Sequence, residues 1–89
     1  MLGSIPKDLK KVKRENLEEE ILRIGMIAEL DAVNLYEQMA AVSQDRKIKK
    51  TLLEIAREEK THVGEFQALL LKRDKEQVKE LEEGKKEIE

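Results

Sequence analysis

Two apolar heptad stripes run along this chain, and each contains ionisable side chains that are out of place in a helix core. The second stripe places Glu59 and the only histidine, His62, at successive inward positions. In the first stripe the misplaced residue is a lone acid, Glu29. The stripes read Leu22, Met26, Glu29, Val33, Tyr36, Ala40 and Ile48, Leu52, Ile55, Glu59, His62, Phe66, Leu69. Spacing that alternates between three and four residues predicts two amphipathic helices that pack together.

The predicted fold is all-α: an antiparallel two-helix hairpin followed by a short C-terminal helix. We expect long helices over residues 17–42 and 46–73, joined by a break at 43–45. The division into domains is a flexible N-terminal arm (1–15), the helical hairpin with its third helix (16–84) and a charged tail (85–89). Two copies are expected to dimerise into a four-helix bundle.

Several residues have the chemistry of helix ends. Asn16 and Glu19 fit a capping box at the start of the first helix, and Ser43 or Asp45 suits the start of the second. The third helix is expected to begin at Asp74, with Gln77 three residues on, and to end at Gly84. Gly25 would weaken the first helix unless it lets a neighbour approach closely.

The composition indicates a protein that associates. The chain has 89 residues, of which 39% are apolar and 43% charged, and only two side chains are aromatic. Such a short chain buries too little surface to offset its ordering entropy comfortably as a monomer. It has no cysteine, which excludes disulfides, iron–sulfur clusters and thiolate metal sites within it.

Net charge and hydropathy limit the kinds of partner that we expect for this chain. The 18 basic and 20 acidic residues are mixed along the sequence, with a net charge of -2, which argues against nucleic acid. No apolar run reaches transmembrane length, so no membrane partner is expected, and residues 1–13 lack the apolar core of a signal peptide. We therefore expect a cytoplasmic protein.

The spacing brings the three misplaced side chains to one place. Glu29 lies 15 residues before Gln44 and Glu59 lies 15 residues after it, so a turn centred there sets both at the same height. His62 follows one turn later on the same face as Glu59. Burying an unpaired carboxylate or imidazole costs several kcal/mol, and a metal ion is the simplest partner.

A second copy would complete a known ligand set. Two hairpins related by a two-fold axis give four glutamates and two histidines, the set used by di-iron carboxylate bundles. Oxygen and imidazole ligands suit iron or manganese, with zinc as a non-redox alternative. Four clustered carboxylates repel one another, so the empty site should destabilise the protein and cation binding should relieve the repulsion.

Each of these residues also has an ordinary interpretation. A lone histidine is often a hydrogen-bonded core residue, and a single acid in a seam often sets helix register. Tyr36, seven residues after Glu29, either hydrogen-bonds a metal-bound species or is an amphipathic core residue. Asp31 lies off the stripe, so the ordinary interpretation is a solvated residue or a subunit contact. The functional alternative is a role in cation uptake.

Two segments together resemble a known family. The run from Glu29 to Tyr36 (Glu-Leu-Asp-Ala-Val-Asn-Leu-Tyr), the run from Ala56 to His62 (Ala-Arg-Glu-Glu-Lys-Thr-His) and the spacing between them are similar to the encapsulated ferritins, relatives of rubrerythrin. The resemblance covers residues 17–83. Some archaeal relatives are fused to the shell protein, and this chain resembles the ferritin-like domain of such a fusion.

The resemblance implies a ferroxidase that oxidises Fe(II) to Fe(III) with dioxygen, for iron storage inside an encapsulin nanocompartment. It implies two iron ions per dimer, shared between subunits and bound by Glu29, Glu59 and His62, with Tyr36 beside them. Family members form homodimers, each a ferritin-like four-helix bundle, that assemble into a ring, commonly a decamer, within an encapsulin shell. Family members also have a metal uptake site, which holds calcium, formed by a pair of acids on either side of the first ligand. In this chain Asp31 matches one acid of the pair, and Ala28 replaces the other.

Two further functions remain open at this point. The first is a rubrerythrin-like di-iron peroxidase with the same ligands, although the cysteine site that usually supplies its electrons is missing here. The second is a non-catalytic structural helical dimer. In that case metal removal should change neither association nor thermal stability.

Overall fold

The computed structural model describes residues 13–89, and these form three α-helices without a β-strand. The short 3₁₀ turn η2 (Arg14–Asn16) leads into α1 (Leu17–Val42), which is followed by α2 (Arg46–Arg73) and α3 (Lys75–Ile88). The all-α class and the bounds of both long helices are confirmed. Most of the predicted N-terminal arm lies outside the described residues.

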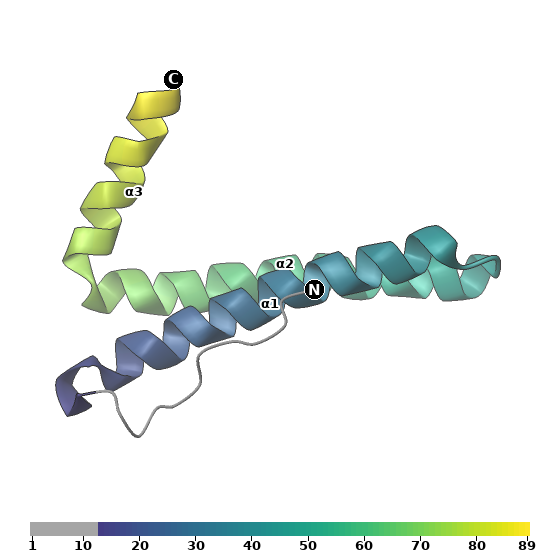
Figure 1. The fold of residues 1–89 in the computed structure, drawn as a ribbon, viewed down its shortest axis with the longest axis horizontal. Helices are drawn as coiled ribbons and strands as arrows, with labels where there is room; N and C mark the ends of the chain where they lie inside the picture. The colour runs from purple at the N-terminus through teal and green to yellow at the C-terminus, as the bar shows by residue number, and fades with distance from the viewer. Residues whose placement is uncertain (1–12) are drawn as a thin grey trace.

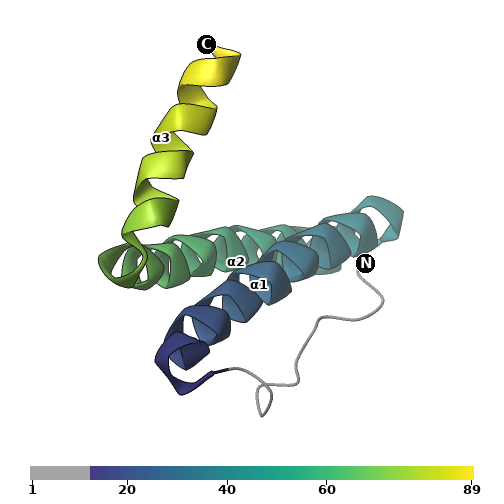
Figure 2. The ribbon, with the colours of Figure 1, turned by 60° about the vertical axis from the view of Figure 1, so that its left-hand side comes forward.

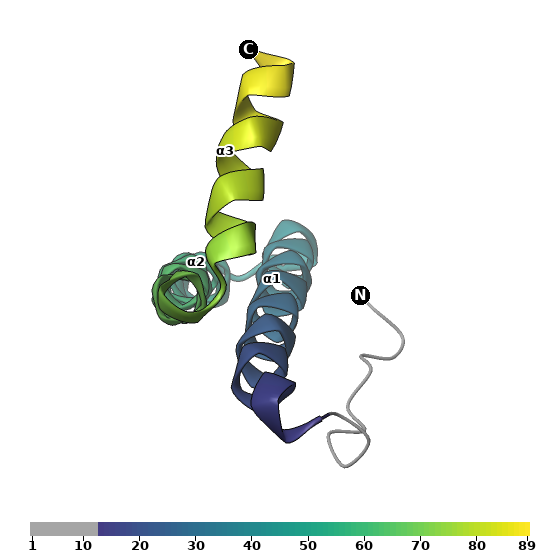
Figure 3. The ribbon, with the colours of Figure 1, turned by 90° about the vertical axis from the view of Figure 1, so that its left-hand side faces the viewer.

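Helices α1 and α2 form an antiparallel hairpin and lie side by side along their length (Figures 1 and 3). The turn between them is ended by Asp45, whose Oδ1 accepts hydrogen bonds from the backbone N–H groups of Lys47 (2.9 Å) and Ile48 (3.0 Å). Asp45 is therefore the N-cap of α2. The capping box predicted at Asn16 is wrong in one respect, because the Asn16 side chain makes no capping hydrogen bond.

Helix α3 turns away from the hairpin at the end of α2 and stands out from it (Figures 1 and 2). Its start is the predicted one, since Asp74 Oδ1 accepts from the backbone N–H of Gln77 at 2.9 Å. The predicted end at Gly84 is wrong, because the helix continues to Ile88. Gly84 has no positive φ, and the residues around it are good helix formers.

The core between α1 and α2 is thin. In the described part the buried residues are Val33 and Ala40 of α1 and Ala56 and Leu70 of α2. Every position of the α1 stripe is buried or half-buried. The α2 stripe differs from the prediction at its two ends, where Ile48 is 54% exposed and Leu69 52% exposed.

The change from Leu69 to Leu70 has a geometric reason. A strict heptad repeat stays in register only if the helices supercoil, and a straight helix with 3.6 residues per turn drifts by about 20° per heptad. Over the length of α2 this drift moves the inward position one residue later. The buried side chain at this end is therefore Leu70.

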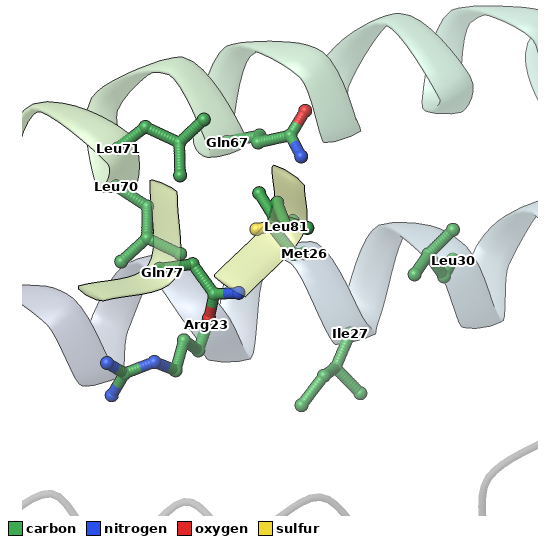
Figure 4. A pocket seen from close by; sticks show the side chains of 9 residues that line it. All are labelled: Arg23, Met26, Ile27, Leu30, Gln67, Leu70, Leu71, Gln77 and Leu81. Atoms are coloured by element: carbon green, nitrogen blue, oxygen red, sulfur yellow. The ribbon is translucent and has the colours of Figure 1, made fainter. Parts of the chain in front are cut away.

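An apolar groove lies where the three helices meet (Figure 4). Its volume is about 280 Å³. The groove is lined by Arg23, Met26, Ile27, Leu30, Gln67, Leu70, Leu71, Gln77 and Leu81. Because Gln77 and Leu81 belong to α3, the orientation of α3 sets the shape of this groove.

Candidate metal centre

Three side chains from the two long helices converge near the middle of the hairpin. Glu29 comes from α1, and Glu59 and His62 come from α2. His62 Nδ1 lies 3.3 Å from Glu29 Oε2 and 3.5 Å from Glu59 Oε2. One ligand atom from each residue can be chosen so that all three lie within 4.8 Å of one another. We call these three residues the triad.

The hairpin brings the triad together in the way the spacing predicts. Glu59 and His62 are three residues apart, which places them on one face of α2. Glu29 is separated from His62 by 33 positions, and the antiparallel turn returns α2 to the same height. The expected proximity of Glu29, Glu59 and His62 is therefore confirmed, while their function as metal ligands stays a prediction.

The triad is partly shielded from water and carries no built-in counter-charge. The side chains of Glu29 and Glu59 are 19% and 18% exposed, and that of His62 is 43% exposed. Among residues 13–89, no lysine or arginine forms an ion pair with either acid. The nearby ion pair between the helices, Lys60 with Glu37 at 3.3 Å, involves neither of them.

The donor atoms of the triad suit a divalent cation. Two carboxylates and an imidazole form a mixed oxygen and nitrogen set that fits iron, manganese or zinc. His62 Nδ1 faces both carboxylates, so a proton on this nitrogen would be shared with them. A metal ion in the same space would take the place of that proton. Within the described part of the chain, the triad is the one group of three or more histidine, cysteine, aspartate or glutamate residues placed so that they could hold a metal ion.

Two further residues were predicted near the site. Tyr36 is half-buried on α1, seven residues after Glu29, which places it about 10 Å further along the helix axis. Asp31 is also half-buried on α1 and is not part of the triad. Ala28, which replaces the second acid of the family pattern, is exposed. The roles proposed for Tyr36 and Asp31 remain predictions.

A glycine and an aromatic ring lie next to the triad. A Cβ atom built on Gly25 would lie 2.8–2.9 Å from three ring carbons of Phe66. Of the two interpretations of Gly25, the structure supports the close approach of a neighbour, which is Phe66. The sequence identified Phe66 only as a member of the apolar stripe. Its spacing of four residues from His62, equal to that of Gly25 from Glu29, was the available signal.

Comparison with known proteins assigns the chain to a family. The family model for rubrerythrin matches residues 20–89. A ferritin-like-encapsulin shell fusion protein from Pyrococcus furiosus is 56% identical over 90 residues, covering 99% of this chain and 26% of the relative. The crystal structure of the encapsulated ferritin domain from P. furiosus superposes with a TM-score of 0.83 at 52% identity, covering 99% of this chain and 92% of that one.

The chain belongs to the rubrerythrin family and has a ferritin-like fold. It spans about a quarter of the length of the curated relative that it matches. Among the residues that the structure describes, none of the helices combines the length and apolarity needed to cross a membrane.

Proposed function

We propose that the triad is half of a di-iron ferroxidase site that two copies of the hairpin complete across a two-fold axis. The observation that carries the proposal is the convergence of two half-buried carboxylates and an imidazole without a lysine or arginine partner. One protomer offers three ligands. A pair offers four glutamates and two histidines, the set that di-iron carboxylate bundles use.

The chemistry follows from the charge of the paired site. Four carboxylates from two protomers match the four positive charges of two Fe(II) ions, which are the substrate. Each Fe(II) gives up one electron, and dioxygen takes up two electrons and two protons to become hydrogen peroxide. Oxidation adds two positive charges that the four carboxylates cannot neutralise, so two hydroxide ions formed from water, whose protons are released to the solvent, would balance the two Fe(III) ions. The two histidines add one imidazole nitrogen each to the ligand set and help to hold the ions in place.

We also propose that the oxidised iron is delivered into an encapsulin compartment for storage. The supporting observation is the relative from P. furiosus, whose name combines a ferritin-like part with an encapsulin shell. This chain aligns along its length with a quarter of that protein. A paired or ring-shaped assembly of hairpins encloses no large cavity of its own, so storage requires a separate shell.

The test compares single substitutions in an aerobic Fe(II) oxidation assay. Glu29→Ala and His62→Ala should reduce oxidation to the rate of Fe(II) in buffer, because each removes two ligands from the paired site. The matched control is Glu65→Ala, which removes an exposed acid from α2 three residues after His62. Equal rates for all three variants would refute the assignment.

The same assay separates the ferroxidase from a peroxidase, which the rubrerythrin match also favours. Fe(II)-loaded protein is mixed either with dioxygen or, under anaerobic conditions, with hydrogen peroxide. A ferroxidase should consume dioxygen and accumulate Fe(III) without an added reductant. Faster turnover with peroxide and an external reductant would identify a peroxidase instead.

A further inference from the structure

The contact between Gly25 and Phe66 lies one helical turn from the triad. Gly25 is four residues before Glu29 on α1, and Phe66 is four residues after His62 on α2. Because the helices are antiparallel, both displacements point to the same end of the hairpin. The Phe66 ring therefore lies between α1 and α2 directly beside the triad, on the side of the α1 N-terminus.

Gly25 differs from the other described glycines in what surrounds it. A Cβ on Gly25 would come within 2.8–2.9 Å of ring carbons Cε1, Cδ1 and Cζ of Phe66, closer than real Cβ contacts. Gly64 and Gly84 have nothing within 4 Å of the same position. A glycine in a helix interior costs stability relative to alanine. At Gly25 that cost has a packing reason, whereas at Gly64 it has none.

The distance that this contact controls is the one between the helices. Glu59 and His62 share α2, so their separation is set by the helix itself. Glu29 is on α1, and its 3.3 Å contact with His62 depends on how closely α1 and α2 approach each other. A methyl group on residue 25 would push the Phe66 ring away or push the helices apart. Either response acts within one turn of the Glu29–His62 contact.

We propose that Gly25 is a positioning residue for the metal site. Its missing side chain seats the Phe66 ring between the helices, and the seated ring fixes the distance from Glu29 to the α2 ligands. Because the half-buried ring lies one helical turn from the triad, the same seating would also place apolar carbon at that end of the site. This inference rests on the proposed function, because it concerns how the same three ligands are held.

The test measures cobalt(II) binding to the metal-free protein by visible absorption, with thermal unfolding measured in parallel. Gly25→Ala should weaken cobalt binding by about tenfold or more and change the absorption spectrum, since supporting residues of metal sites have effects of this size. The matched control is Gly64→Ala, an alanine placed in the other helix with open space around it. It should raise the unfolding temperature and leave cobalt binding unchanged.

A second substitution tests the ring. In Gly25→Ala combined with Phe66→Leu, the shorter side chain leaves room for the methyl group, and cobalt affinity should recover part of the loss. Phe66→Leu alone should weaken binding by uncovering the triad, and it supplies the test if Gly25→Ala does not fold. Recovery of cobalt affinity without a matching rise in unfolding temperature would show that alanine at position 25 acts on the site and not only on overall stability.

The outcomes separate this inference from the proposed function. If wild-type protein binds neither cobalt(II) nor Fe(II), the proposed metal site is wrong, and so is the role proposed for Gly25. Wild-type protein that binds cobalt(II), with an unchanged affinity and spectrum in both Gly25→Ala and Phe66→Leu, would overturn only the inference. A crystal structure of Gly25→Ala with the Glu29–His62 contact unchanged would also overturn it.

Discussion

Charged side chains link α1 to a later part of the chain in two places, and the acids have different partners in each. At the corner where α2 meets α3, each acid has its own arginine. Arg73 Nε donates to Glu19 Oε1 at 3.1 Å, and Arg23 Nη2 donates to Asp74 Oδ2 at 2.7 Å. We call these four residues the corner cluster. At the triad, two acids face only an imidazole.

Both acids of the corner cluster have a pKa below the ordinary value, although Glu19 Oε2 is buried without a hydrogen-bond partner. The pKa of Glu19 is lowered by a hydrogen bond from its own backbone N–H and then by the Arg73 side chain. The pKa of Asp74 is lowered by the backbone N–H of Gln77 and then by Arg23. At the corner cluster, where the acids connect parts of the fold, each acid is paired with an arginine. At the triad, where the hairpin supplies no arginine, we expect the missing positive charge to come from a metal ion.

The largest expected effect is the response of the triad to metal. Adding Fe(II) without oxygen to metal-free protein should raise the unfolding temperature, because a ligand at 100 times its Kd stabilises the folded state by about 2.7 kcal/mol. If two protomers share the site, metal should also increase the fraction of dimer in sedimentation. Calorimetry and sedimentation in Fe(II) and in chelator measure both changes.

Two variants sharpen the contrast with the corner cluster. His62→Ala should lose the stabilisation by Fe(II), whereas Arg73→Gln should keep all of it while unfolding at a lower temperature in every condition. Wild-type protein with the same stability and the same association state in Fe(II) and in chelator would favour the purely structural dimer.

The second prediction is that replacing glutamate by glutamine changes the stability of the metal-free protein in opposite directions at the triad and at the corner cluster. In metal-free protein at pH 8, Glu29→Gln removes one of two acids whose oxygens lie within 4.8 Å, a repulsion of about 1 kcal/mol even at the dielectric constant of water. Stability to urea should therefore rise. Glu19→Gln removes the acceptor of Arg73 and should lower stability.

Fe(II) provides the control for this pair. Glu29→Gln should be more stable than wild type in chelator and less stable than wild type in Fe(II). Glu19→Gln should be less stable than wild type in both. A loss of stability in chelator for both variants would show that the triad, like the corner cluster, is held together by attraction within the chain.

The sequence predicts the hairpin and the triad because both depend on local regularities. Helix bounds follow from the periodicity of apolar residues and from the caps at Asp45 and Asp74. The meeting of Glu29 with His62 follows from a short turn and a fixed rise per residue. Errors arise where a regular pattern meets a competing effect. Because of helical drift, the buried residue near the end of α2 is Leu70 and not the predicted Leu69. Strong helix formers around Gly84 let α3 continue beyond its predicted end, to Ile88.

The corner cluster was beyond prediction for a different reason. Glu19 and Arg73 are 54 residues apart, and which of many acids pairs with which long basic side chain depends on how the start of α1 lies against the end of α2. No periodicity encodes that arrangement. The contact of Gly25 with Phe66 is an intermediate case, since the sequence indicates a close approach but does not say which side chain makes it.

The smallest expected effect is the pH dependence of the corner cluster. Because the pKa values of Glu19 and Asp74 are lower in the folded protein than their ordinary values of 4.5 and 3.8, their contribution to stability is complete above those values. It declines as the pH falls through the lowered values. The double variant Glu19→Gln and Asp74→Asn should therefore lose less stability than wild type in this acid range, and asparagine keeps the cap of α3.

Thermal unfolding in chelator from pH 7 to pH 3 measures this difference between the two proteins. Salt is the control, because both side chains reach solvent and 1 M salt screens exposed charges that are more than about 3 Å apart. The difference should shrink in high salt but not vanish, since backbone N–H groups contribute the largest part of both pKa shifts. Parallel pH profiles for the two proteins would contradict the prediction, because they would mean that Glu19 and Asp74 add no pH-dependent stability to the folded state.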